Sequence, residues 1–123
     1  MHRSRLAGFI IDCHDADLPS AATFWSAALG MPAHQPEGDQ YVPLDSTARG
    51  VHIEVQSVDH PSRLHLDIES DDVDAEAARL ERLGAKRVSK VKSWWVMEAP
   101  TGHRFCVVRA KGLDGAPGVN VWD

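Results

Sequence analysis

The sequence has few cysteines and no long apolar run, and each absence removes a class of protein. Its two cysteines, Cys13 and Cys106, have neither the number nor the spacing of a disulfide framework or a zinc motif. Both lie in apolar, strand-like runs, where a free cysteine behaves as a small hydrophobic residue. No apolar stretch approaches the roughly 20 residues of a membrane span, and the basic start of the chain reaches Asp12 too soon for a secretory signal. We therefore expect a cytoplasmic protein.

Basic residues are also scarce. Thirteen Lys and Arg stand against 18 Asp and Glu, a net charge of −5, so the chain lacks the basic field that binding to phosphate backbones or anionic membranes requires. The sequence contains no glycine-rich phosphate loop and no nucleophile elbow. We expect neither a nucleic-acid partner nor a membrane partner. Seven His and four Trp stand beside a single Tyr, which raises the question of whether they converge on one site.

The first half of the chain predicts a strand, a helix and two further strands. Residues 6–13 are β-branched and aromatic in the middle, as is typical of a strand. Pro19 suits a first helical turn, and Gly30 is a typical helix stop. The predicted buried stripe of this helix consists of Ala21, Phe24, Trp25, Ala28 and Leu29. Strands are predicted at 40–44 and at 51–56, where the polarity alternates.

The same order of elements then starts again. An alternating strand is predicted over 64–69, and Asp71-Asp72 begins a helix that ends at Gly84. Its predicted buried stripe is Val73, Ala77, Leu80 and Leu83. Three short strands follow, around 86–91, 93–97 and 104–109. An internal repeat of about 50 residues is too small to bury its own apolar face, so the halves must pack on each other or on another chain.

These elements give a domain organisation. We expect a single domain over 1–123, with a first module at about 6–56, a second at about 63–109 and a tail over 110–123. The end of the tail, Val119–Trp122, is expected to dock or to mediate a contact, because an exposed tryptophan gains little in water.

Three stretches carry a resemblance to a known family: 24–31, 64–85 and 99–105. In these stretches the sequence resembles the vicinal-oxygen-chelate superfamily of glyoxalase I, bleomycin-resistance proteins and extradiol dioxygenases, and within it the small glyoxalase-like domains. The resemblance implies an α+β fold of two βαβββ modules, whose strands form a U-shaped, partly open sheet around a cavity with the helices outside. It also implies a homodimer, since the family commonly builds its cavities across dimers.

The resemblance further implies positions for metal ligands. Metal-dependent members take one ligand from the first strand and one from the last strand of each module. His65, seven residues before Asp72, matches the first-strand ligand of the second module, and Glu54 matches the last-strand ligand of the first module.

The other two ligand positions do not match. The first-strand position of the first module falls on Ile10 or on Gly8, and Cys106 replaces the glutamate of the final strand. The implied divalent metal would therefore be held by Glu54 and His65, with Cys106, His52 or Asp67 completing the set.

Strand alternation supports a polar site independently of the family. His52, Glu54 and Gln56 share one face of a strand, and His65, Asp67 and Glu69 share one face of another, while their neighbours are good core residues. If these side chains are buried together, they need a metal, water or a polar ligand as partner. The alternative is a solvated sheet face, which needs no function. We favour solvation for His52, Gln56 and Glu69 individually, and a site for Glu54 and His65.

Aromatic residues add candidates for substrate binding. Trp94 and Trp95 are consecutive in a strand, so we expect one ring to pack under the helices and the other to line the cavity. Tyr41 occupies the corresponding strand of the first module. With Asp67 and His52, these three residues form the predicted substrate-binding set.

Two functions remain open. The first is a glyoxalase-like small-molecule enzyme of the lyase, isomerase or dioxygenase type, with Glu54 and His65 as catalytic residues and metal-assisted or acid–base chemistry. The second is a non-catalytic protein that binds a drug or metabolite, for which the incomplete ligand set, the net charge of −5 and the tryptophan pair argue. Apart from the divalent metal, no cofactor is expected.

Overall fold

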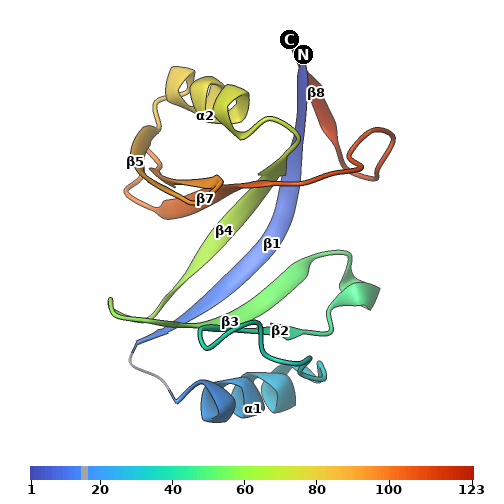
Figure 1. Ribbon diagram of the computed structural model, residues 1–123, viewed down its shortest axis with the longest axis vertical. Helices are drawn as coiled ribbons and strands as arrows, with labels where there is room; N and C mark the ends of the chain where they lie inside the picture. Colours follow the sequence, from blue (N-terminus) through green and yellow to red (C-terminus); the bar gives the residue numbers. More distant parts are fainter. Residues whose placement is uncertain (15–16) are drawn as a thin grey trace. The chain divides into compact units, whose positions relative to one another are not determined.

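The computed structural model describes residues 1–14 and 17–123, and confirms the α+β class with an open eight-stranded sheet and two α-helices (Figure 1). The elements are β1 (His2–His14), α1 (Leu18–Leu29), β2 (Tyr41–Leu44), a 3-10 turn (Thr47–Arg49), β3 (His52–Val58), β4 (Arg63–Ser70), α2 (Val73–Arg82), β5 (Lys86–Val91), β6 (Trp94–Glu98), β7 (Arg104–Arg109) and β8 (Asn120–Trp122). Neither α-helix is long and apolar enough to span a bilayer, among the residues described.

The chain divides into two compact units, residues 8–65 and residues 1–7 with 66–123. In the first unit β1 pairs in parallel with β3, β2 pairs antiparallel with β3, and α1 contacts β2 and β3. In the second, β4 pairs in parallel with β7, β6 pairs antiparallel with both β7 and β5, and α2 contacts β5, β6 and β7. Both units therefore contain a parallel pair with an antiparallel neighbour and one helix.

The first module has two strands after its helix, where the resemblance implies three. In place of the extra strand the connection after α1 makes two isolated bridges, Ala33 with Leu44 and Glu37 with Tyr41. Pro32 and Pro36 lie in this connection. Because proline has no N–H to donate, a regular ladder is interrupted there.

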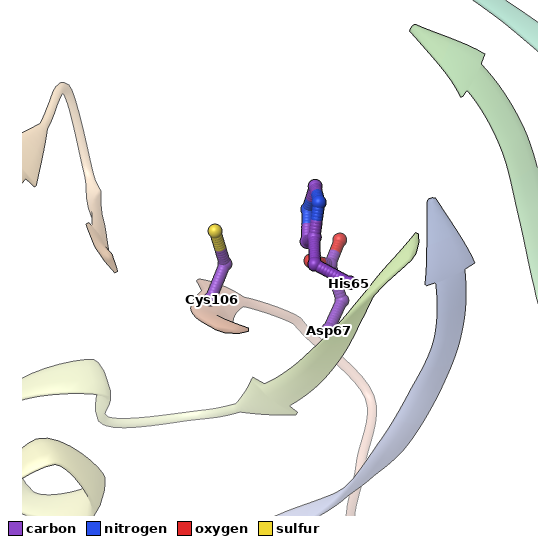
Figure 2. A group of neighbouring side chains, drawn as sticks. All are labelled: His65, Asp67 and Cys106. Atoms are coloured by element: carbon purple, nitrogen blue, oxygen red, sulfur yellow. The ribbon is translucent and has the colours of Figure 1, made fainter. Parts of the chain in front are cut away.

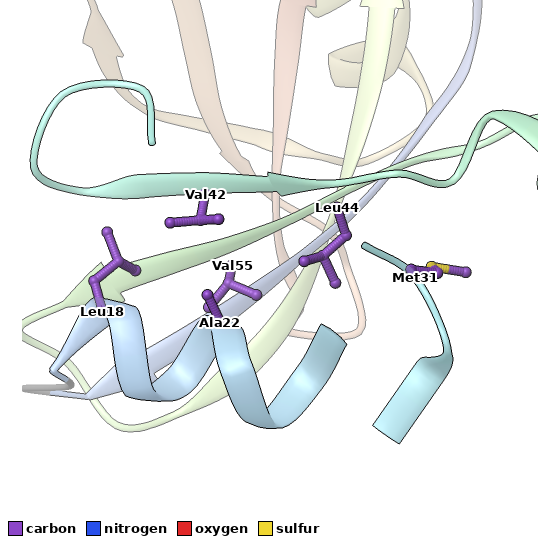
Figure 3. Packing of buried hydrophobic residues seen from close by; sticks show 6 residues of the cluster. All are labelled: Leu18, Ala22, Met31, Val42, Leu44 and Val55. Carbon is purple, nitrogen blue, oxygen red and sulfur yellow. The ribbon is translucent and has the colours of Figure 1, made fainter. Parts of the chain in front are cut away.

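The helix α1 is bounded as expected, but its buried face is different. Pro19 lies in its first turn and Gly30 ends it with φ of 68°. The residues that it buries are Leu18 and Ala22, which pack with Met31, Val42, Leu44 and Val55 (Figure 3). Phe24 is 61% exposed and packs edge-on against Trp25, so the prediction that it is a core residue is wrong. Ala21 and Trp25 pack against this cluster as predicted, but Phe24 lies two residues after Ala22 and so faces nearly the opposite side of the helix.

The helix α2 follows its prediction except at the last position. The Asp72 side chain accepts a hydrogen bond from the Ala75 N–H, and Val73, Ala77 and Leu80 are buried against Met97 and Val107. Leu83 is 67% exposed because the helix ends at Arg82.

Strand β4 alternates between polar and apolar residues as expected, but its apolar leucines are exposed and its polar residues are covered. Leu64 is 63% exposed and Leu66 is 45% exposed, whereas the side chain of His65 between them is only 13% exposed. The expectation that the leucines are core residues is therefore wrong. The polar face of this strand is the covered one.

Strand β1 begins four residues earlier than predicted, because polar partners stabilise its start. His2 and Ser4 are buried, and Nε2 of His2 lies 2.8 Å from Oε1 of buried Glu76. The first residues of β1 pair with β8, where Nε1 of Trp122 donates to Oγ of Ser4 at 2.9 Å. The Arg79 guanidinium stacks 3.9 Å from the centre of the Trp122 ring. The predicted docking of the tail is confirmed.

Candidate functional site

Three side chains that can ligate a metal converge on β4 and its neighbour β7: His65, Asp67 and Cys106 (Figure 2). Asp67 and Cys106 are directly paired in the register of the two strands, and His65 lies two residues before Asp67 on the same face of β4. One ligand atom from each residue lies within 4.8 Å of the other two. The group thus offers an imidazole nitrogen, a carboxylate oxygen and a sulfur together.

His65 is held by a carboxylate that the sequence analysis did not select. Nδ1 of His65 lies 2.7 Å from Oδ2 of Asp12, whose side chain is 1% exposed. The other oxygen of that carboxylate, Oδ1, is buried and has no hydrogen-bond partner among the described residues. An acidic residue inside the apolar run of β1 was the available signal, since a buried carboxylate needs a partner.

Glu54 and His52 lie together on β3. Nε2 of His52 is 2.6 Å from Oε1 of Glu54, and the Glu54 side chain is 14% exposed while that of His52 is 49% exposed. On the same strand, Gln56 donates to the Tyr41 hydroxyl at 3.2 Å. Glu54 is not a member of the His65 group, whose other members are Asp67 and Cys106 among the described residues.

Of the two tryptophans, Trp95 is the one that packs under a helix. It lies against the core beneath α2, and its Nε1 donates to Oδ1 of Asp74 at 2.8 Å. The Arg87 guanidinium lies 4.8 Å from the centre of the Trp95 ring. The hydrogen bond from Trp95, followed by the one from Lys90, lowers the pKa of Asp74. Because consecutive strand residues alternate, Trp94 faces the opposite side.

Residues 8–108 match the family described as the glyoxalase-like domain. The chain belongs to this family. Solved structures of the same fold include methylmalonyl-CoA epimerase from Streptomyces coelicolor, with 17% identity, a TM-score of 0.61 and coverage of 88% of this chain and 98% of that one. The epimerase from Mycobacterium tuberculosis has 18% identity, a TM-score of 0.63 and coverage of 91% and 92%.

A third structure of this fold is a glyoxalase/bleomycin resistance protein/dioxygenase superfamily member from Vibrio splendidus, with 16% identity, a TM-score of 0.56 and coverage of 87% and 99%. No match was found among the curated proteins. The resemblance inferred from the sequence is thus confirmed at the level of family and fold.

The two residues at which the resemblance places a first-strand ligand of the first module offer no donor atom. Gly8 has no side chain, and Ile10 is 3% exposed in the core. Asp67 on β4 offers a carboxylate beside Cys106 instead. Nitrogen, oxygen and thiolate sulfur are all accepted by zinc and related divalent ions, so the donor set fits a metal.

Proposed function

We propose that this glyoxalase-like domain is a small-molecule enzyme that uses a divalent metal held by His65, Asp67 and Cys106. The observation that carries the proposal is the approach of their three ligand atoms to within 4.8 Å of one another. Three protein ligands leave a coordination position open, which is the arrangement of catalytic rather than structural metal sites. A divalent metal at this position would polarise a carbonyl oxygen of the substrate.

The remaining chemistry is assigned to Glu54, which we propose as the group that accepts and returns a proton. Its carboxylate is largely covered and is held by His52 at 2.6 Å, so its orientation is fixed. It lies on β3, and only β1 separates that strand from β4, which carries His65. Isomerases and lyases transfer a proton at the carbon next to a carbonyl group. A small substrate that carries a carbonyl oxygen would therefore suit Glu54 in this role.

Substrate contacts are proposed for Tyr41 on β2, His52 on β3, Asp67 on β4 and Trp94 on β6, whereas Trp95 packs on the helix side of its strand. One structural neighbour, the Streptomyces coelicolor epimerase, was solved with 2-nitronate-propionyl-CoA. For this chain we propose a small carbonyl compound as the substrate class, with a coenzyme A ester as one member to test.

Metal content tests the proposal directly. The purified protein is loaded with Zn²⁺, Co²⁺, Ni²⁺, Mn²⁺ or Fe²⁺, dialysed, and analysed for bound metal and thermal stability. We expect one equivalent of metal and a higher Tm in the wild type, and loss of both in Cys106→Ser and His65→Gln. Cys13→Ser, which changes the other free cysteine, should bind as the wild type does. Absence of stoichiometric metal and of any stabilisation would overturn the metal-dependent enzyme.

The same preparation distinguishes the binding-protein alternative. The acidic balance and the Trp94 ring are the features that would suit a cationic aromatic ligand. Quenching of tryptophan fluorescence by such compounds in metal-free protein, unchanged in Glu54→Gln, would support a binding role. No quenching by a panel of cationic aromatic compounds would remove it.

We also propose that the protein is a homodimer. Leu64 and Leu66 are exposed two residues apart on the same face of β4, and Leu6 on β1 is 47% exposed. Neighbouring exposed leucines on a strand are unfavourable in water and are typical of an association surface. A second copy of the chain is the proposed occupant.

A further inference from the structure

We infer that the first module carries a second small-molecule site, a cavity between α1 and residues 33–42 that takes an organic cation with an apolar body. The cavity has a volume of about 420 Å³. Small-molecule sites in proteins enclose about 300–1,000 Å³, so the space is sufficient for a small organic ligand. The residues that line it all belong to the unit of residues 8–65.

The cavity lies on the face of β2 and β3 that α1 covers. Val42 of β2 is opposite Val55 of β3 in the register, and both belong to the cluster that packs against α1. Glu54 is next to Val55, so strand alternation places it on the other face. Neither Glu54 nor a candidate metal ligand is among the described residues that line the cavity. The cavity can therefore bind a ligand whether or not the proposed metal-dependent enzyme is correct.

The inner wall of the cavity is apolar. Figure 3 shows Leu18 and Ala22 on the side of α1 that faces Val42 of β2, and all three side chains are buried. Ala33 and Pro36, which are exposed, extend the apolar lining outward. A ligand with an apolar body would remove this surface from water when it binds.

Hydrogen bonds hold the outer wall in place. The backbone N–H of His34 donates to the Pro43 carbonyl at 2.9 Å, and that of Glu37 donates to the Tyr41 carbonyl at 2.8 Å. Pro36 lies between these two contacts and restricts the backbone there. This connection replaces the third strand that the resemblance implies. Because its backbone is fixed, the cavity exists before a ligand arrives, which reduces the cost of ordering on binding.

Asp39 gives the cavity a negative charge. It lies in the turn before β2 and lines the cavity, and its carboxylate makes no hydrogen bond or ion pair with another described residue. No lysine or arginine is among the described lining residues. The other ionisable side chain there is His34, which lies near the carboxylate of Asp45. A carboxylate without a compensating cation attracts a positively charged ligand and repels an anion.

The charge of the ligand is the variable that tests the inference. Three probes share a naphthalene ring and differ in charge: naphthylmethylamine, naphthylmethanol and naphthoate. Each is titrated at neutral pH into protein with ¹³C-labelled methyl groups, and binding is followed by the assigned methyl signals of Leu18, Ala22 and Val42. We expect saturable shifts of these signals with the amine, weaker binding of the alcohol and the weakest binding of naphthoate.

Two pairs of variants separate the charge of the cavity from its shape. Asp39→Asn should weaken binding of the amine about two- to fivefold, as expected for an exposed ion pair, and leave the alcohol unchanged. Glu37→Gln, which removes a neighbouring charge outside the lining, should have a smaller effect. Ala33→Phe should fill the cavity and abolish binding of all three probes. Ala28→Phe, on an exposed part of α1 outside the lining, should bind them as the wild type does.

The absence of shifts at Leu18, Ala22 and Val42 with every probe, or shifts confined to other residues, overturns the inference. Naphthoate binding as tight as that of the amine, or an amine affinity unchanged in Asp39→Asn, overturns it as well. The wild type and Asp39→Asn are sufficient for these comparisons even if Ala33→Phe does not fold.

Discussion

The buried carboxylate of Glu76 is expected to supply a large part of the stability of the unit that contains α2. Its side chain is fully buried, with Nε2 of His2 at 2.8 Å. Nε and Nη2 of Arg79 donate to its two oxygens at 2.8 and 2.9 Å, a two-point ion pair. Through Arg79 the network reaches Trp122, so it joins the first strand, the helix and the tail.

The pKa of Glu76 provides the magnitude. Burial acts to raise this pKa, but hydrogen bonds from Arg79, His2 and Ser4, together with the Arg79 charge, outweigh it and lower the pKa from 4.5 to about 2. A shift of that size corresponds to about 3 kcal/mol in favour of the folded, ionised state. Because the pKa is lowered on folding, this stabilisation is complete above about pH 4.5 and is lost as the pH falls toward 2.

Glu76→Gln removes the charge and keeps the size of the side chain. We expect it to lower the free energy of unfolding by about 3 kcal/mol at pH 7, since Arg79 then loses its buried counter-charge. The difference from the wild type should shrink steadily between pH 4.5 and 2.5. Urea unfolding, followed by tryptophan fluorescence at several pH values, measures both quantities.

Glu81→Gln is the matched control, on the same helix. Glu81 pairs with Arg87 at the surface at 2.8 Å, with a side chain 43% exposed, so its loss should cost less than about 1 kcal/mol. Other carboxylates titrate equally in the wild type and in the variants and cancel in the difference. If the Glu76→Gln difference is the same at pH 7 and pH 2.5, or is no larger than that of Glu81→Gln, the reasoning is wrong.

Three further predictions concern other parts of the chain. Gly8→Ala should destabilise the protein by at least ~2 kcal/mol in urea unfolding, because a Cβ there would collide with the backbone of His52 on the paired strand β3; wild-type stability would refute this. Trp122→Ala should lower the Tm and expose the start of β1 to hydrogen exchange, and unchanged protection of Ser4 would contradict a docked tail. Leu64→Ser should convert a dimer to a monomer by light scattering, whereas a wild type that is already monomeric removes the proposed homodimer.

The sequence was sufficient to predict both helices and most strands, but much less so to predict which face of each element is buried. Turn residues such as Gly30 and the N-cap Asp72 act locally, so the limits of both helices could be predicted. The buried face of α1 could not be predicted in this way, because the burial of Leu18 rather than Phe24 depends on the strands that the helix contacts. Strand β4 illustrates the same limit, since alternation separates its two faces and does not say which of them is covered.

His65, Asp67 and Cys106, which form the candidate site, were all named as possible ligands from the sequence, whereas Asp12, which holds His65, was missed. His65 was selected because the resemblance gives it a ligand position, and Cys106 because the resemblance places it where a glutamate ligand is expected. What brings Cys106 to Asp67 is the parallel register of β4 and β7, a long-range pairing that the spacing of residues along the chain does not contain. Asp12 was passed over because its meaning depends on His65, 53 residues later, at 2.7 Å. A polar residue inside an apolar strand is therefore a useful signal, because its burial requires a hydrogen-bond or charge partner, and that partner can belong to a functional site.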